Sequence, residues 1–218
     1  MADDPRVIPA RPDLAALHLK DLVEADVYAS PTKMRASVPL APLTGSRDAE
    51  GEMTSQLIFG ESFTAYETDN GWVWGQTALD GYVGFVPEAC LMEDHGDATH
   101  RITAVQALVY PDPDFRARPI GALPFGARVS TGERNEPFVE LDVGGWVGET
   151  TVKPITEKAP MWVATAERFK GAPYLWGGRS AAGFDCSGLV QIALQSANIA
   201  CPRDSDQQMA ALGRDASH

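Results

Sequence analysis

A cysteine at the start of a predicted helix is the residue best placed to do chemistry in this sequence. Cys186 follows a glycine-rich segment, residues 171–183, and precedes an apolar stretch with helical spacing. The partial positive charge at a helix N-terminus stabilises a thiolate, and the free N–H groups there can stabilise an oxyanion. Asp185 is suited to cap this helix or to bind a cationic group. The pattern indicates a nucleophilic thiol; a cysteine that only packs a helix end is the alternative.

The other cysteines support neither a disulfide framework nor a metal site. Cys90 and Cys201 complete a set of three, which cannot all pair, and none lies in a C-x-x-C spacing. The sequence shows no cluster of metal ligands and no phosphate-binding loop. Residues 111–114, Pro-Asp-Pro-Asp, are typical of a turn rather than of a calcium site. We therefore expect no metal and no organic cofactor.

A degenerate internal repeat precedes the cysteine segment. Residues 57–60, Leu-Ile-Phe-Gly, reappear as Leu-Pro-Phe-Gly at 123–126, and Gly-Tyr-Val-Gly at 81–84 reappears as Gly-Trp-Val-Gly at 145–148. Each copy contains short runs of aromatic and β-branched residues between turn signals. This pattern is typical of a small all-β barrel present twice. Chance similarity between glycine-punctuated strands is the alternative.

Helical periodicity begins after the second copy of the repeat. Trp162, Ala166 and Phe169 share one face of a first helix. A second helix is expected over residues 186–197, and a third from about residue 205, closed by Gly213. The apolar residues of these two helices are expected to face inward: Leu189, Val190, Ala193, Leu194, Ala197, Met209 and Leu212.

These patterns divide the chain into four parts. We expect an N-terminal extension over 1–19, barrels over 20–95 and 98–156, and a helical segment over 157–218. The predicted fold class is therefore multidomain, mainly β followed by α+β.

Composition excludes several classes of partner. The 218 residues include 18 basic and 30 acidic side chains, for a net charge of −12. Without a basic cluster, this balance argues against nucleic acid or an anionic membrane as partner. No apolar run reaches the roughly 18 residues that span a bilayer. The first residues lack the basic and apolar regions of a secretory signal, so a cytoplasmic location is the simplest expectation.

Three motifs after residue 170 resemble the NlpC/P60 cysteine peptidases. They are P-Y-x-W-G-G at 173–178, D-C-S-G-L at 185–189 and P-R-x-S-x-x-Q at 202–208. That family has a papain-like fold and cleaves peptidoglycan stem peptides. Two bacterial SH3-like barrels ahead of such a domain resemble the arrangement of γ-D-glutamyl-L-diamino-acid endopeptidases. The resemblance thus implies two SH3-like β-barrels followed by the N-terminal helical part of a papain-like domain.

The resemblance implies roles for four residues around the cysteine. Cys186 would be the nucleophile that attacks the γ-D-glutamyl amide carbonyl. Asp185 and Ser187 would line the pocket, with Asp185 suited to the ammonium group of a free L-alanine. Tyr174 matches a tyrosine whose hydroxyl lies near the cysteine.

Four further residues receive roles from the same resemblance. Arg203 and Ser205 would meet the D-glutamate carboxylate, for which an arginine fork and a hydroxyl are suitable partners. Glu61 and Tyr82 of the first barrel resemble residues that block the pocket and bind the free amine. A solvated glutamate and a core tyrosine are the alternatives for these last two.

A papain-like site also needs a histidine to take the thiol proton. Only His218, the final residue, follows Cys186, and no strand pattern surrounds it. His18, His95 and His100 precede the segment in polar contexts. We therefore expect the N-terminal portion of a longer protein, with its helices needing a sheet to bury against. A natural pseudo-enzyme ending at this point is the alternative.

The sequence thus predicts a cysteine peptidase that hydrolyses the γ-D-glutamyl to diamino-acid bond of wall-derived peptides, for cell-wall recycling. Its partner would be a peptidoglycan-derived peptide with a free N-terminal L-alanine, and residues 1–218 alone would be inactive. A non-catalytic protein that binds wall peptides is the first alternative. An amidase or transferase acting on lipid-like acyl groups is the second.

Overall fold

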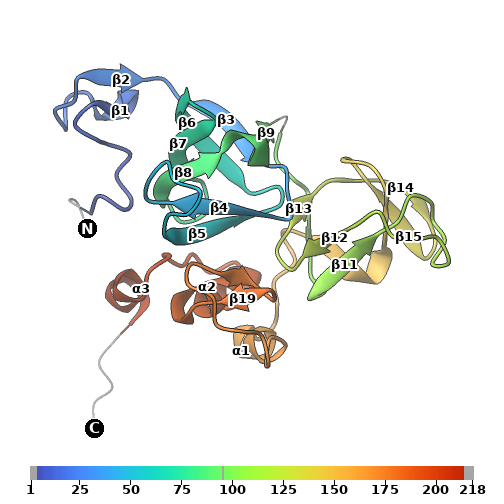
Figure 1. Cartoon of the computed structure of the whole chain (residues 1–218). Helices are drawn as coiled ribbons and strands as arrows, with labels where there is room; N and C mark the ends of the chain where they lie inside the picture. The colour runs from blue at the N-terminus through green and yellow to red at the C-terminus, as the bar shows by residue number, and fades with distance from the viewer. Residues whose placement is uncertain (1–3, 95, 214–218) are drawn as a thin grey trace, which may run out of the picture.

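A seven-stranded antiparallel sheet occupies the centre of the computed structural model, which describes residues 4–94 and 96–213 (Figure 1). We call it the first sheet. Its strands follow the order β5-β4-β8-β7-β6-β3-β9. Their bounds are β3 (Thr32–Ala36), β4 (Leu40–Thr44), β5 (Met53–Ile58), β6 (Ser62–Asp69), β7 (Trp72–Thr77), β8 (Val83–Pro87) and β9 (Leu91–Glu93).

Alternating side chains give this sheet its core. In β8, Gly84 and Val86 are buried while their neighbours are partly exposed, as expected for a strand with one covered face. Phe63, Leu57 and Val73 come from three further strands of the sheet and belong to the same buried cluster. The sheet therefore encloses a hydrophobic core of its own.

A second β region follows, over residues 100–154. It forms three small antiparallel sheets, β13-β10-β17, β11-β12 and β14-β15-β16. Their strands are β10 (His100–Ile102), β11 (Gln106–Val109), β12 (Gly121–Pro124), β13 (Arg128–Val129), β14 (Thr131–Asn135), β15 (Phe138–Leu141), β16 (Trp146–Gly148) and β17 (Val152–Pro154).

The sequence repeat has a counterpart in the backbone. Gly60 and Gly126, at matching positions of the two copies, have φ angles of 75° and 87°. Gly81 and Gly145 likewise have φ angles of 74° and 84°. These left-handed conformations are accessible to glycine at little cost, which explains why the glycines recur where each copy turns.

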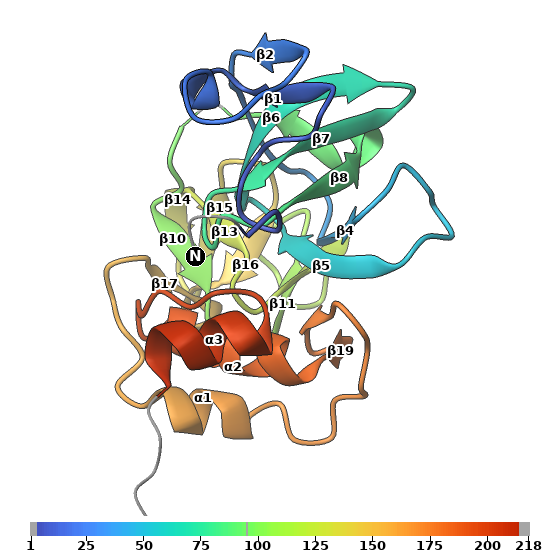
Figure 2. The same ribbon diagram turned by 90° about the vertical axis from the view of Figure 1, so that its left-hand side faces the viewer.

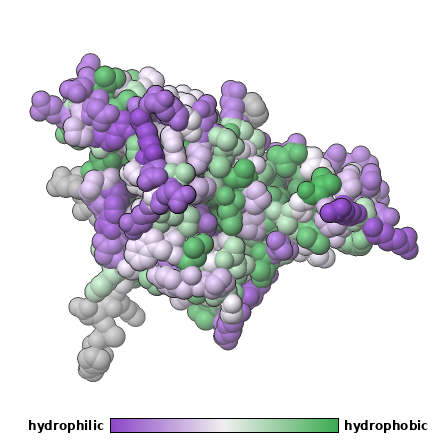
Figure 3. All heavy atoms as spheres, viewed as in Figure 1, coloured by the Kyte–Doolittle hydropathy of each residue, from purple (hydrophilic) through white to green (hydrophobic). Residues whose placement is uncertain are grey.

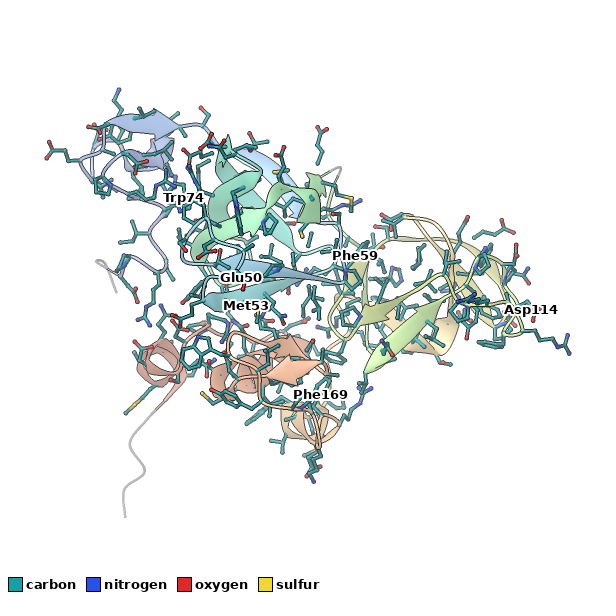
Figure 4. The ribbon with its side chains drawn as sticks, in the orientation of Figure 1. Glu50, Met53, Phe59, Trp74, Asp114 and Phe169 are labelled. Carbon is teal, nitrogen blue, oxygen red and sulfur yellow. The ribbon has the colours of Figure 1, made fainter. Side chains whose placement is uncertain are left out.

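The first sheet and the second β region touch through their backbones. The Arg128 N–H donates to the Phe59 carbonyl oxygen at 2.8 Å. A Cβ atom added to Gly60 would lie 2.0 Å from the Arg128 carbonyl oxygen. Figure 4 shows Phe59 where the two parts meet. A glycine is therefore required there both by its φ angle and by the closeness of the neighbouring chain.

The helical segment contains α1 (Trp162–Glu167), α2 (Cys186–Ser196) and α3 (Ser205–Leu212). A short hairpin of β18 (Arg179–Ser180) and β19 (Gly183–Phe184) lies between α1 and α2. The second and third helices begin where the sequence predicts them. The hairpin is absent from the sequence-based expectation because each of its strands has only two residues.

The predicted inward faces of these helices were wrong in part. Met209 is 69% exposed, whereas Gln207 and Gln208 of the same helix are buried. In α2, Val190 is exposed and Gln191 is fully buried, and in α1 Trp162 is exposed. The buried amides make hydrogen bonds inside the molecule, which offsets the cost of removing them from water.

Part of the apolar surface of the helical segment is buried against the two β parts of the chain. Phe169 packs edge-on against Phe125 of the second β region, with 5.4 Å between ring centroids. Phe184 and Ile192 join the same buried cluster, which also includes Phe59 of the first sheet. Figure 4 shows Phe169 beneath this junction. Other large apolar side chains of the segment are exposed, among them Met161, Val163 and Leu212. The expectation that the helices need a sheet or an equivalent partner therefore stays a prediction.

The N-terminal residues form a separate layer on the first sheet (Figure 2). Strand β1 (Leu14–Ala16) pairs in parallel with β2 (Val27–Ala29), and a 3-10 turn, Leu17–Leu19, follows β1. The boundary expected after residue 19 falls inside this paired unit. None of the helices within residues 4–94 and 96–213 is long and apolar enough to cross a bilayer.

Candidate active site

A pocket of about 300 Å³ opens where the first sheet, the helical segment and the N-terminal residues meet. Cys186 lines this pocket. Its lining comes from six stretches of chain: Arg6; Glu52 and Thr54; Tyr82; Trp176; Asp185, Cys186 and Ser187; and Asp204, Ser205 and Asp206.

Cys186 is the first residue of α2 and is exposed. The Asp185 carboxylate caps the helix by accepting a hydrogen bond from the Gly188 N–H at 2.6 Å. The thiol is thus held at the positive end of an eleven-residue helix and on the wall of the pocket. This placement is the one that the sequence predicts for a reactive cysteine.

The other two cysteines lie in different surroundings. Cys201 is buried, and burial raises the pKa of its thiol to about 11. Cys90 is half-buried, and burial likewise raises its pKa. Both thiols are therefore held in the neutral, weakly nucleophilic form at neutral pH, and neither lines the pocket.

Asp185 is committed to contacts within the protein. Arg203 binds both of its carboxylate oxygens, and the Gly177 N–H donates to Oδ2 at 3.0 Å. Burial by itself raises the pKa of Asp185, but the hydrogen bonds from Arg203 and Gly188 hold it below the usual value. With every oxygen occupied, Asp185 positions the loop and the helix. The expectation that it offers a free carboxylate to an ammonium group does not fit this geometry.

Arg203 lies behind the pocket rather than in it. Its side chain is only 1% exposed, and Nε donates to the Ser55 hydroxyl at 2.9 Å while Nη1 donates to Ser187 at 2.9 Å. Together with the two bonds to Asp185, these contacts use four of its five N–H donors. The predicted direct contact with a substrate carboxylate is wrong for the described structure, because Arg203 is buried and does not line the pocket.

Glu61 also lies outside the pocket. It is 4% exposed and forms a two-pronged ion pair with Arg179, with distances of 2.8 and 3.1 Å. The Ile58 N–H donates to the same carboxylate at 3.0 Å. The prediction that Glu61 meets the substrate amine is corrected accordingly: Glu61 fastens the first sheet to the start of the β18–β19 hairpin.

The remaining predicted residues divide into those inside and those outside the pocket. Ser187, Ser205 and Tyr82 line it. The Tyr82 hydroxyl donates to Asp204 at 3.0 Å, and burial raises the pKa of that hydroxyl. Tyr174 is 66% exposed and is absent from the lining, so the described structure does not bring its hydroxyl into the pocket.

Several lining residues escaped the sequence analysis. Asp204 occupies the variable position of the P-R-x-S motif, where nothing marked it as functional. Asp206 occupies another variable position of the same motif, Glu52 lies in a stretch without a motif, and Arg6 belongs to the extension. Trp176 belongs to the P-Y-x-W-G-G motif but received no role in the site. The shared signal is the acidic character of Glu52, Asp204 and Asp206, which becomes visible only when the fold brings them together.

The far side of the pocket is acidic. Glu52, Asp204 and Asp206 contribute three carboxylates, and Arg6 is the one basic side chain of the lining. Figure 3 shows mainly hydrophilic residues on this side of the molecule, at the left of the view. Because Asp185 is already neutralised by Arg203, the remaining charge of the lining favours a cationic ligand group.

Neither histidine described by the structure lies in this pocket. His18 belongs to the turn after β1, and His100 lies in β10 of the second β region. His95 and His218 fall outside the described residues. Within residues 4–94 and 96–213, no group of three histidine, cysteine or acidic side chains is arranged to hold a metal ion.

Comparison with protein families separates two parts of the chain. Residues 45–91 match the bacterial dipeptidyl-peptidase SH3 domain, and residues 171–217 match the NlpC/P60 family. The first match lies within the first sheet, and the second includes Cys186 and the pocket residues of α2 and α3. The SH3-like identity of the second β region stays a prediction.

Individual relatives agree with these matches. The γ-D-glutamyl-L-lysine dipeptidyl-peptidase of Bacillus cereus is 26% identical over 181 residues, which are 72% of this chain and 54% of that protein. The γ-DL-glutamyl hydrolase of Bacillus subtilis is 42% identical over 71 residues, which are 31% of this chain and 17% of that protein. The chain thus spans about half of the first relative and less of the second.

A solved structure shares the fold. The crystal structure of an NlpC/P60 family protein from Bacillus cereus superposes with a TM-score of 0.70, at 20% identity, and the match covers 82% of this chain and 77% of that one. The chain thus contains one stretch that matches a bacterial SH3 domain and a second, including Cys186, that matches the NlpC/P60 family.

Proposed function

We propose that Cys186 is the nucleophile of a cysteine peptidase that cleaves γ-D-glutamyl bonds to a diamino acid in wall-derived peptides. The observation that carries the proposal is the exposed thiol at the capped start of α2, on the wall of a pocket with an acidic far side. The second β region is, in this proposal, a second SH3-like barrel that completes the platform for the peptidase segment.

The proposed reaction begins with attack of the Cys186 sulfur on the amide carbonyl carbon. The free N–H groups at the start of α2 are placed to stabilise the oxyanion. The carbon–nitrogen bond then breaks, the diamino acid leaves with a proton on its amine, and a thioester remains. Water hydrolyses the thioester and restores the thiol. The proton acceptor is a histidine in this proposal, as the family resemblance implies, and neither His18 nor His100 fills that role.

The acidic side of the pocket supports a substrate with a free amino terminus. Glu52, Asp204 and Asp206 supply negative charge to the lining of the pocket, and Ser187 and Ser205 supply hydroxyl groups. An ammonium group suits the first set, and the D-glutamate carboxylate suits hydroxyl donors. The name of the Bacillus cereus relative supports a γ-D-glutamyl substrate.

Replacing the nucleophile tests this proposal most directly. The product of the whole gene should release the diamino acid from L-Ala-γ-D-Glu-diamino-acid peptides, followed by mass spectrometry. Cys186→Ala should lower kcat/KM by at least about 1,000-fold, because the covalent route is lost. Cys90→Ala is the matched control and should retain activity. Equal turnover by Cys186→Ala and the unaltered protein would contradict the mechanism.

A binding protein without catalysis is the second candidate. The absence of a histidine from the described part of the pocket favours it. Calorimetry would distinguish the two: tight peptide binding by the whole gene product, with no product after long incubation, supports the binding protein. We expect residues 1–218 alone to bind peptide without measurable turnover.

A further inference from the structure

The N-terminal strap, residues 4–8, places a cation inside the pocket. Arg6 Nη1 donates to Asp204 Oδ2 at 2.8 Å, and Nη2 donates to Asp206 Oδ2 at 2.7 Å. Its Nε and Nη2 also bind Asp4 within the strap. Arg6 thereby pairs with two of the three carboxylates on the acidic side.

The strap is held on both sides of the pocket. The Val83 N–H of the first sheet donates to the Arg6 carbonyl oxygen at 2.7 Å, and Gln76 Nε2 donates to the Val7 carbonyl oxygen at 2.9 Å. On the helical side, Gln207 Nε2 donates to Asp4 at 2.9 Å. Hydrogen bonds from both the first sheet and α3 thus fix the position of the guanidinium group.

The Oδ2 atom of Asp204 has both of its acceptor sites occupied while Arg6 is bound. Its Oδ2 accepts from Arg6 and, at 3.0 Å, from the Tyr82 hydroxyl. Its side chain also accepts the Gln207 backbone N–H as part of the capping box of α3. A ligand ammonium that binds Oδ2 of Asp204 must therefore take the place of the arginine.

We propose that Arg6 is a specificity-determining residue that occupies the cation position of the pocket until a ligand amine displaces it. This inference rests on the proposed function, because it assigns the acidic side to the amino terminus of the peptide. Displacement leaves Asp204 and Asp206 without a counter-ion, and only a cationic ligand end restores the balance. A peptide with a blocked amino terminus cannot do so.

Peptide binding tests the inference in a Cys186→Ala background, where no turnover occurs. Arg6→Ala should lower the Kd of L-Ala-γ-D-Glu-diamino-acid peptide about 3- to 10-fold, the range expected for removing a partly exposed ionic competitor. The Kd of the N-acetylated peptide should not change. Arg11→Ala is the matched control, because Arg11 belongs to the same N-terminal layer but pairs with Asp13 and Glu67. An unchanged or higher Kd for the free-amine peptide in Arg6→Ala would overturn the inference.

A second measurement does not depend on the peptide. A cationic methanethiosulfonate should modify Cys186 about 3- to 10-fold faster in Arg6→Ala than in the unaltered chain, and an anionic one should not, since the acidic side is then open to cations. Arg11→Ala should leave both rates unchanged, and Cys186→Ala supplies the background. Suppose that neither the unaltered chain nor Arg6→Ala binds peptide, but the cationic reagent modifies Cys186 faster in Arg6→Ala. The proposed substrate is then wrong, and the role of Arg6 stands. An equal cationic rate in both chains overturns that role.

Discussion

The two β parts of the molecule hold the same helical segment by different chemistry. The first sheet uses buried polar contacts: Glu61 pairs with Arg179, and Ser55 accepts a hydrogen bond from Arg203. The second β region uses apolar contacts, with Phe125 against Phe169 in a shared core. The pocket opens on the polar side.

This difference suggests separate roles for the two kinds of contact: the apolar contacts stabilise the protein, and the polar contacts position Cys186. Apolar burial stabilises without strong directional demands, whereas a hydrogen-bonded ion pair is satisfied in only one geometry. The chain of contacts from Ser55 through Arg203 to Asp185 ends at the residue that caps α2 and precedes Cys186. Directional contacts thus lie where the thiol must be placed, and the apolar contacts lie behind it.

One polar contact on the second side also concerns α2. Arg101 of β10 donates to the carbonyl oxygens of Gln195 at 3.1 Å and Ser196 at 2.6 Å, at the C-terminal end of the helix. A cation at this end complements the negative end of the helix dipole. Each β part therefore supports one end of α2.

Breaking the Glu61–Arg179 pair should give the largest effect on stability. Glu61→Ala leaves a buried guanidinium without its carboxylate, which we expect to cost about 3–5 kcal/mol in the free energy of unfolding. Urea denaturation measures this. Glu50→Ala, an exposed residue of the β4–β5 connection labelled in Figure 4, should change stability by less than about 0.5 kcal/mol. A loss below about 1 kcal/mol for Glu61→Ala would show that the pair contributes little.

Removing apolar contacts between α2 and the second β region should lower the stability of the protein without moving Cys186. Ile192→Ala removes buried methyl and methylene groups from the shared core and should cost about 2–5 kcal/mol. Where the variant is folded, its peptide affinity should match that of the unaltered chain, because the polar contacts remain. A weaker peptide affinity under conditions where the variant is fully folded would contradict the idea that the apolar contacts stabilise the protein without positioning the thiol.

Acidification should act on the polar side alone, with a smaller effect. The pKa of Asp185 lies below its ordinary value, so its stabilising contribution is complete above that value and is lost as the pH falls toward the lowered pKa. Stability therefore declines as the pH falls below about 4, the ordinary range of an aspartate, toward the lowered pKa. Asp185→Asn should flatten this decline by at most about 1.4 kcal/mol per pH unit. Denaturation at several pH values measures the slope, and an unchanged slope would contradict the assignment.

The sequence predicted the parts of the site that depend on local signals. An aspartate before an apolar run predicted a capped helix, and Asp185 caps α2 with Cys186 as its first residue. The repeated glycines at 60 and 126 predicted turns that recur in the backbone. Both signals act within a few residues, so a single sequence contains them in full.

The contacts that connect distant segments could not be predicted from the sequence. Glu61 and Arg179 are 118 positions apart, and Arg6 and Asp204 are 198 positions apart. Opposite charges are common along any chain, and no spacing rule selects the pairs that the fold buries. For the same reason Glu61 and Arg203 looked like ligands for a substrate, although each meets its counterpart inside the protein.

The contact at Gly60 has a mechanical consequence. Where side chains separate two domains, rotamer changes allow them to slide and tilt. Here the chains meet backbone to backbone, with the Arg128 carbonyl in the space where a Cβ of residue 60 would lie. The joint has little compliance, so we expect the two β parts to move as one stiff frame. Adjustment to a bound peptide then falls to the segments attached at the edge of that frame.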